Sequence, residues 1–139
     1  MAKTIEQKVV FRNTTPKKVY DLYMNAKLHS HIVGNPVKIS NKVGTNFSAH
    51  GGWLTGKNLY LVNGKLIVQA WRGSDWSKEH GDSIFMIRLE PKGKNVELYA
   101  VHANLPDKAV EGISKGWYNH YWNPWKQHLA GKPIKRAKM

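Results

Sequence analysis

The sequence contains no cysteine, few acidic residues and no long apolar segment. The absence of cysteine excludes disulfide scaffolds, thiolate metal sites and cysteine nucleophiles, and it suits a reducing compartment. The first twelve residues carry charges at Lys3, Glu6, Lys8 and Arg12, so they hold no apolar stretch of signal-peptide length. No stretch has the length needed to span a membrane. These absences favour a cytoplasmic protein with no membrane insertion.

The sequence contains nine Asp and Glu residues and 22 Lys and Arg residues, which gives a formal net charge of +13. A field of this sign favours anionic partners but carries no information about the fold. The basic residues are scattered, and the one local cluster lies in 132–139, which we expect to be a basic C-terminal tail. Arginines placed for base recognition and aromatic residues beside basic ones on strands are both missing, so we expect no specific nucleic acid partner.

Motifs for metal binding and catalysis are missing as well. Among the seven histidines, His29 and His31 would point in different directions on a helix, and no His-Glu-x-x-His set occurs, so we expect no metal and no cofactor. A Gly-x-Ser-x-Gly motif is absent. Asp75 lies among turn-forming residues, and we expect it to pair with Arg72. The sequence therefore predicts no catalytic residue and a protein that is not an enzyme, although a cyclase-like catalyst can work without a recognisable motif.

The chain does contain a clear order of strand and helix patterns. Alternation predicts an opening strand over 4–12. Thr15 can cap a helix that begins at Pro16, and apolar residues spaced three and four apart extend this helix to Ala26. A second short helix is expected at 28–33, before Gly34 and Pro36.

A series of antiparallel strands is expected between residues 36 and 105. Asn63 and Gly64 separate two apolar runs, which predicts a two-residue hairpin turn with positive φ at both positions. That turn would pair Val62 with Lys65 and Leu61 with Leu66. A second hairpin is expected from the two longer runs at 83–91 and 95–105. Two weaker strands, at 36–40 and 45–51, are expected before the first hairpin.

The last helix is predicted to be unusually long, from residue 107 to residue 130. Asp107 is the expected cap, and Pro124 inside the pattern predicts a bend because proline removes one hydrogen bond. Helical spacing places the aromatic residues on one broad face, which comprises Val110, Ile113, Trp117, Tyr118, Tyr121, Trp122, Trp125, His128 and Leu129. Such a stripe is typical of a helix packed on a sheet, and a bend above a curved sheet allows an apolar cavity beneath it.

Three segments resemble a known family: FRNTTPKKVYDLYMN (11–25), GWLTGKNLYLVNGKLIVQAWRGSDW (52–76) and GWYNHYWNPWKQHLAG (116–131). They are similar to the C-terminal domain family of activators of the heat-shock protein 90 ATPase, within the START-like, helix-grip superfamily. The resemblance implies an α+β fold with a curved antiparallel sheet of about six strands gripped around a long C-terminal helix. It also implies one domain over 1–131, often with an apolar cavity between sheet and helix.

Members of this superfamily include co-chaperones, lipid and hormone carriers and aromatic cyclases, and a fold does not fix a function. Our hypothesis is a non-catalytic binding module for a small hydrophobic molecule or lipid. The cavity is expected to be lined by Tyr23, Phe47, Trp71, Trp117, Tyr121 and Trp125. The alternative is a co-chaperone-type domain that docks on heat-shock protein 90. Family proteins use a separate N-terminal domain in engaging the chaperone. We expect no such domain here, so we expect docking through this module alone and no stimulation of the chaperone ATPase.

Overall fold

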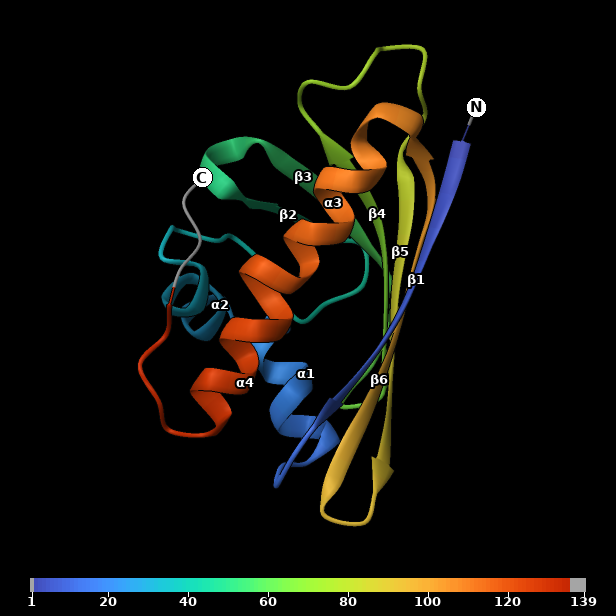
Figure 1. The fold of residues 1–139 in the computed structure, drawn as a ribbon. Helices are drawn as coiled ribbons and strands as arrows, with labels where there is room; N and C mark the ends of the chain where they lie inside the picture. The colour runs from blue at the N-terminus through green and yellow to red at the C-terminus, as the bar shows by residue number, and fades with distance from the viewer. Residues whose placement is uncertain (1, 136–139) are drawn as a thin grey trace.

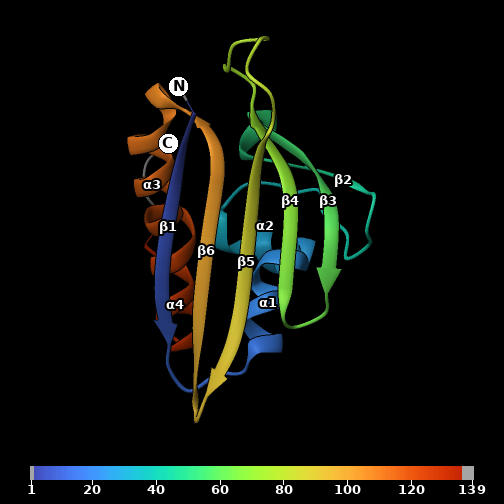
Figure 2. The ribbon, with the colours of Figure 1, turned by 90° about the vertical axis from the view of Figure 1, so that its right-hand side faces the viewer.

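One antiparallel sheet of six strands organises the molecule. The computed structural model describes residues 2–135, and its strands lie in the order β1-β6-β5-β4-β3-β2 (Figure 2). The chain runs as a meander from β2 to β6, and β1 pairs with β6 at the far edge. The strands are β1 (Ala2–Phe11), β2 (Asn46–Ala49), β3 (Leu54–Val62), β4 (Leu66–Gly73), β5 (Ser83–Lys92) and β6 (Asn95–Pro106). The expected α+β class and six-stranded curved sheet are confirmed.

All helices lie on one face of this sheet (Figure 1), and Figure 2 shows the opposite face uncovered. Two short helices follow β1, and a long helical segment follows β6 and crosses the sheet. The helical elements are α1 (Pro16–Met24), α2 (Ala26–Val33), η1 (His50–Gly52), η2 (Asp107–Ala109), α3 (Val110–Trp117), η3 (Tyr118–Trp122) and α4 (Asn123–Leu129). No helix within residues 2–135 has the length and apolar character required to cross a membrane.

The start of α1 is as predicted, because the Thr15 side chain accepts a hydrogen bond from the amide of Lys18 at 3.3 Å. The end of this helix differs from the prediction. Asn25 ends α1 and caps α2 by accepting from the amide of Leu28 at 3.1 Å. The second helix therefore begins at Ala26, two residues before the predicted start, and it ends at Gly34, whose φ of 76° only glycine adopts readily.

The hairpin between β3 and β4 exists, but its predicted register was wrong. Val62 pairs with Leu66 and Leu61 pairs with Ile67, so three residues form the turn. Only Gly64 has a positive φ, of 75°, and the amide of Lys65 donates to the carbonyl of Val62 at 2.8 Å. This register directs Ile67 into the core with 1% of its surface exposed, while Tyr60 is 56% exposed on the uncovered face.

Only one of the two weaker strands forms. The second becomes the short edge strand β2, which pairs with β3. The segment 36–40 makes a single bridge between Lys38 and Ser48. Pro36 lacks an amide hydrogen, which suits a segment at the edge of a sheet better than a paired strand.

The final helix is not one regular α-helix from 107 to 130. Asp107 does not cap it: Asp107 is the first residue of the 3-10 turn η2, and Pro106 occupies the capping position without a side-chain hydrogen bond. Five residues before α4 form a π-helical turn, in which the amide of Asn123 donates to the carbonyl of Tyr118. Pro124 follows in the first turn of α4. The π turn thus changes the backbone hydrogen bonding just before Pro124, which has no amide hydrogen to donate.

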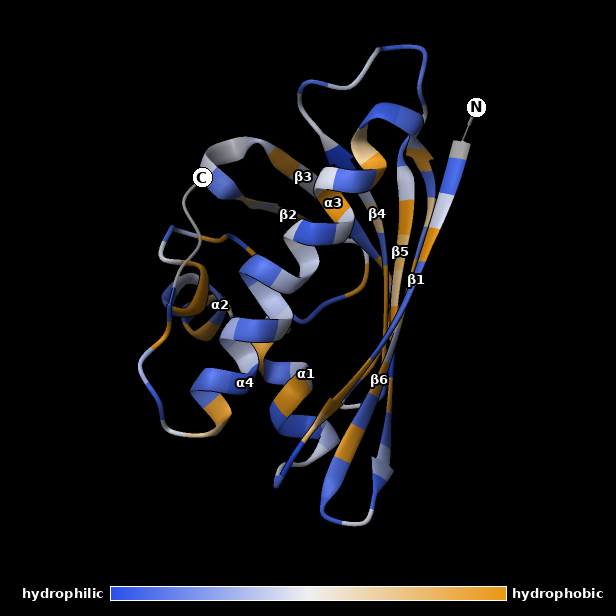
Figure 3. Cartoon of the chain, in the orientation of Figure 1, coloured by the Kyte–Doolittle hydropathy of each residue, from blue (hydrophilic) through white to orange (hydrophobic). Residues whose placement is uncertain are grey.

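The aromatic face of this helix forms much of the core. Trp117, Trp122 and Trp125 expose 3%, 0% and 1% of their surfaces. The hydropathy colours of Figure 3 show α3 and α4 as mostly blue and white, so hydropathy alone understates this burial. Tyr118 was wrongly assigned to the buried face and is 37% exposed, because the π turn that starts there changes the angular spacing.

The segment after α4 remains close to the domain as far as it is described. Ile134 packs against the core, and the amide of Lys135 donates to the side chain of Gln127 at 2.8 Å. Residues 136–139 of the expected basic tail lie outside the described residues. The division at residue 131 between domain and tail stays a prediction.

Candidate functional site

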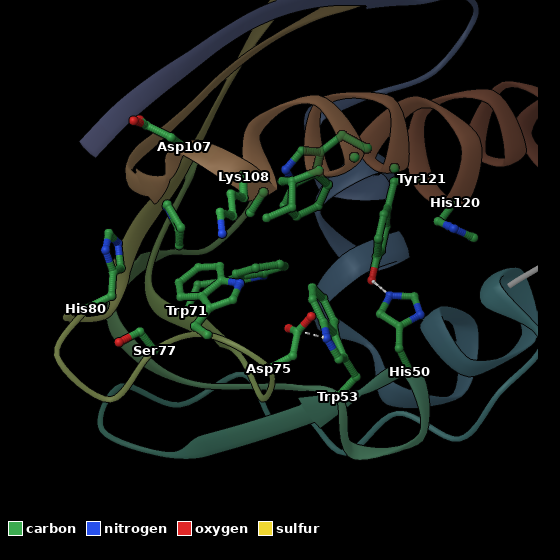
Figure 4. Close-up of a pocket in the computed structure, with 17 residues that line it drawn as sticks. His50, Trp53, Trp71, Asp75, Ser77, His80, Asp107, Lys108, His120 and Tyr121 are labelled. Carbon is green, nitrogen blue, oxygen red and sulfur yellow. Dashed lines mark hydrogen bonds between the residues drawn. The ribbon is translucent and has the colours of Figure 1, made fainter. Parts of the chain in front are cut away.

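A pocket of about 990 Å³ lies at one end of the sheet, beneath the first turns of the final helical segment. Figure 4 shows that its walls come from the helix, the end of β4, the loop at 74–82 and η1. Besides Pro106, Ala109 and Ile113, the side chains that line it form an aromatic group and a polar group. The aromatic group is Trp53, Trp71, Trp76, Trp117 and Tyr121, and the polar group is His50, Asp75, Ser77, His80, Asp107, Lys108 and His120.

Trp71 is the centre of the aromatic wall. Its ring centroid lies 5.7 Å from that of Trp53 at 77°, and 5.7 Å from that of Trp76 at 42°. Trp117 from α3 contacts it at 6.1 Å and stacks on Phe85 of β5 at 4.1 Å and 9°. These flat side chains come from two strands, a loop and a helix, so the tertiary fold assembles the wall. Tilted and edge-to-face contacts of this kind stabilise aromatic clusters.

The helix contributes small residues to its side of the pocket. Gly112 and Gly116 lie four residues apart on α3, and both line the pocket. A Cβ atom at Gly112 would have no neighbour within 4 Å, and at Gly116 it would meet only Cδ2 of His120 at 3.8 Å. Packing against other atoms therefore does not require glycine at either position.

The loop at 74–82 is held over the pocket by Arg72. Its guanidinium donates to the carbonyl of Ser77 at 2.7 Å and to that of His80 at 2.6 Å, and it lies 3.5 Å from a carboxylate oxygen of Asp82. The expected pairing of Arg72 with Asp75 was wrong. Asp75 instead accepts from the indole nitrogen of Trp53 at 2.8 Å (Figure 4).

A buried polar chain connects the helix to the sheet behind the aromatic wall. The indole nitrogen of Trp117 donates to Nδ1 of His102 at 3.2 Å, and Nε2 of His102 lies 2.7 Å from the hydroxyl of Ser83. The hydroxyl of Ser83 donates to the carbonyl of Trp71 at 2.8 Å. Nδ1 must therefore accept and Nε2 must carry the proton. Burial lowers the pKa of His102 to about 3, so this imidazole is neutral.

A second polar chain crosses the other end of the pocket at Tyr121. Nδ1 of His29 lies 2.9 Å from the carbonyl oxygen of Tyr23, which can only accept, so Nδ1 carries the proton. Nε2 of His29 then accepts from the Tyr121 hydroxyl at 2.9 Å, and that oxygen accepts from Nε2 of His50 at 2.9 Å. Burial lowers the pKa of His29 to about 4. Burial, with a smaller repulsion from His120, lowers the pKa of His50 to about 4.

The backbone that presents His50 adopts an unusual conformation. His50, Gly51 and Gly52 have φ angles of 53°, 68° and 88°, all in the left-handed region. Glycine adopts these angles freely, but a histidine there costs about 1 kcal/mol. The side chain thereby reaches Tyr121 and contacts His120, with ring centroids 5.5 Å apart.

The six side chains expected to line a cavity are divided by the structure. Trp71, Trp117 and Tyr121 line the pocket. Tyr23 and Trp125 lie in the core instead, and the Tyr23 hydroxyl donates to the side chain of Gln69 at 2.9 Å. Phe47 lies on β2 opposite Gly56 of β3, also outside the pocket. Contact of any of these residues with a ligand stays a prediction.

The sequence analysis did not identify several residues of the pocket. Trp53, Trp76 and His50 belong to the turn before β3, a loop and a 3-10 turn, where no periodic pattern selects them. The two glycines of α3 offered a usable signal, since glycine inside a helix is unfavourable and calls for a reason. Among residues 2–135, no group of three or more His, Cys, Asp or Glu side chains is placed to hold a metal ion.

Comparison with known proteins gives a consistent result. The family model described as "Activator of Hsp90 ATPase homolog 1-like protein" matches residues 13–130. A Dictyostelium discoideum protein named "Activator of 90 kDa heat shock protein ATPase homolog" is 32% identical over 118 residues, which are 83% of this chain and 30% of that protein. The chain thus spans less than a third of the length of that relative.

Solved structures share the fold. The crystal structure of an HSP90 activator from Plasmodium falciparum matches with a TM-score of 0.81 and 19% identity, covering 97% of this chain and 99% of that chain. A crystal structure of a Chromobacterium violaceum protein matches with a TM-score of 0.70 and 26% identity, covering 91% and 94%. These likenesses confirm the helix-grip arrangement.

Proposed function

Because the chain belongs to the family of Activator of Hsp90 ATPase homolog 1-like proteins, we propose that it is a non-catalytic binding module of this family. The occupant of the pocket is a small hydrophobic molecule. The single observation that carries this proposal is the pocket itself, of about 990 Å³, with four tryptophans in its lining. Pockets of this size with aromatic walls and a few polar groups are typical of small-molecule sites.

The glycines of α3 support a pocket that is kept open. A glycine inside a helix is less favourable than alanine by about 1 kcal/mol. Alanine would fit at Gly112 without a contact within 4 Å, so the smaller residue gives no packing advantage. What it does provide is free volume on the helix side of the pocket. We infer that the function of the site depends on this volume.

The polar side chains support binding rather than catalysis. The Tyr121 hydroxyl is held between two imidazoles, and Ser77 and His80 bond to Glu79 and to the carbonyl of Asn104. Neither His50 nor His120 bonds a carboxylate within the described residues, so the orienting group of an acid–base pair is missing there.

Filling the pocket tests this function. Gly112→Leu places an isobutyl group in the hollow, while Glu111→Leu places the same group on the exposed side of the same helix, where the Glu111 side chain is 82% exposed. Native mass spectrometry of the purified wild type should show a bound small molecule, or fluorescent fatty acids and flavonoids should raise its melting temperature. Gly112→Leu should abolish both effects and Glu111→Leu should preserve them. Wild-type protein that shows neither effect contradicts the proposal.

A second candidate function is docking on a heat-shock protein 90 chaperone. It is supported by family membership, by the name of the Dictyostelium relative and by the formal charge of +13, which suits an acidic partner. A pull-down of the host chaperone at low salt should recover a complex that weakens at moderate salt. Absence of a complex at low salt contradicts docking, and retention of the complex by Gly112→Leu separates docking from ligand binding.

A further inference from the structure

Lys108 differs from the other polar residues of the pocket. It lies in η2, at the start of the final helical segment, and Figure 4 shows its ammonium group pointing into the pocket above the tryptophan wall. It forms no hydrogen bond and no ion pair with a described residue. The Lys115 side chain on the same segment, in contrast, lies 2.9 Å from Glu111. A positive charge without an ion pair therefore faces a pocket whose largest side chains are tryptophans.

Most other polar groups around the hollow are already engaged. The carboxylate of Asp75 accepts from Trp53, the hydroxyl of Tyr121 bonds two histidines, and Nε2 of His80 bonds the carbonyl of Asn104. His120 contacts His50, and burial lowers its pKa, which favours the neutral ring. Lys108 thus forms no ion pair within residues 2–135, and the lining holds two carboxylates, Asp75 across the pocket and Asp107 next to Lys108 in the chain.

We propose that the pocket binds an aromatic carboxylic acid, whose carboxylate pairs with Lys108 and whose ring lies among the tryptophans. The inference rests on the proposed function and names the chemical class of the ligand. Two features of the lining support it. The walls are flat indole rings, which contact a planar ring over a larger area than a flexible chain. The exposed ammonium group of Lys108 lies beside the indole rings, so a carboxylate on a ring bound among them can reach it.

The carboxylate of Asp75 favours a ligand of the opposite charge, and the experiment must compare the two kinds of ligand. Asp75 lies across the pocket from Lys108 in Figure 4, and its negative charge would favour an ammonium group. The Trp53 indole nitrogen already donates to it, however, and the strongly basic chain attracts anions in general. Three probes that share one ring system and are anionic, neutral or cationic distinguish a carboxylate ligand from an ammonium ligand.

The experiment measures the affinity of 2-naphthoate, 2-naphthalenemethanol and 2-naphthalenemethylamine by isothermal titration calorimetry at pH 7.5. The wild type should bind naphthoate about fivefold or more tightly than the neutral alcohol and the amine more weakly than either. Lys108→Met should remove the preference for naphthoate over the alcohol. Lys126→Met is the matched control, because it removes the same charge from an exposed position of α4 outside the pocket.

The outcomes separate the ligand class from the proposed function. Equal binding of the three probes, tighter binding of the amine, or an equal effect of the two lysine variants overturns the role of Lys108 while ligand binding itself stands. Binding of dodecanoate at least as tight as that of naphthoate overturns the aromatic part of the inference. No binding of any probe, together with an empty pocket in native mass spectrometry, contradicts the proposed function.

Discussion

The indole nitrogen of Trp117 donates a hydrogen bond to Nδ1 of His102 at 3.2 Å, which joins the final helix to strand β6 through two buried side chains. The bond fixes the tautomer of His102 and directs its second nitrogen at Ser83. Two walls of the pocket, from α3 and from the sheet, are therefore held together by a fully satisfied polar chain. A buried chain of this kind is costly to leave incomplete.

Ser83→Ala tests that chain. The substitution leaves the Nε2 proton of His102 and the carbonyl of Trp71 without their partner in a site where Ser83 is 0% exposed. We expect the free energy of unfolding to fall by about 1–3 kcal/mol in urea titrations. Ser40→Ala is the control, since its hydroxyl bonds Thr45 at an exposed site, and it should change stability by less than about 0.5 kcal/mol. Equal effects of the two substitutions would show that the chain contributes nothing.

The buried imidazoles predict a loss of stability in mild acid. Burial lowers the pKa of His29 to about 4 and that of His102 to about 3, from the ordinary histidine value of 6.5. Below pH 6.5 the unfolded chain takes up protons that the folded protein does not bind, so the folded state loses stability as the pH falls toward 4. Each of these two groups contributes about 1 kcal/mol per pH unit.

Urea midpoints at pH 7.5, 5.5 and 4.5 measure this dependence. The His102→Gln variant should lower the slope by about one proton, because it removes one of the imidazoles whose pKa is lowered by burial. A stability that is flat between pH 6.5 and 4.5 would show that the imidazoles are not buried in neutral form.

The sequence predicts the elements of this fold better than it predicts the pocket. The start of α1 was predicted correctly because the Thr15 hydroxyl and the Pro16 ring act on neighbouring residues. Strands β5 and β6 were predicted correctly because the alternation of their residues follows the alternation of buried and exposed positions. The π turn was missed, since a spacing of 100° per residue assumes a regular α-helix, and Tyr118 was misplaced for that reason.

The pocket depends on pairings between distant parts of the chain. Trp53 and Trp76 are 23 positions apart, yet each contacts Trp71, and no local sequence pattern predicts these contacts. The division of the aromatic residues between core and pocket has the same origin. The hydroxyl of Tyr23 donates to the Gln69 side chain and lies outside the pocket. The position of Gln69 depends on how β4 pairs with its neighbours, which the sequence alone does not show.

Two glycines in different surroundings give a matched pair of predictions. A Cβ atom at Gly56 would lie 2.2 Å from the carbonyl oxygen of Ala70 and 2.4 Å from Phe47, whereas one at Gly112 would have no neighbour within 4 Å. Gly56→Ala should destabilise the protein by about 2 kcal/mol or more. Gly112→Ala should stabilise it by about 1 kcal/mol, because alanine favours the helix. Chemical denaturation of both variants checks the opposite signs, and a shared sign would contradict the positions assigned to the two glycines.

Arg72 predicts the behaviour of the loop that covers the pocket. Its guanidinium reaches two carbonyls of the loop at 74–82 together, at 2.6 and 2.7 Å, and a planar fork of donors suits this geometry. Arg72→Ala should raise hydrogen exchange of the loop about tenfold or more, as expected for the loss of roughly 1.4 kcal/mol of local stability. Arg72→Lys should restore little of the protection, since a single ammonium group replaces the fork.

The control for this prediction is Arg88→Ala on the uncovered face of the sheet. Arg88 pairs with Glu90 and lies 4.3 Å from the ring of Tyr99, and it forms no hydrogen bond with the loop in the described residues. Its removal should leave exchange in the loop unchanged, and cleavage by trypsin after Lys78 should accelerate only in the Arg72 variants. If Arg72→Lys protects the loop as well as arginine does, the positive charge rather than the pair of carbonyl bonds holds the loop, and Asp82 at 3.5 Å becomes the partner that matters.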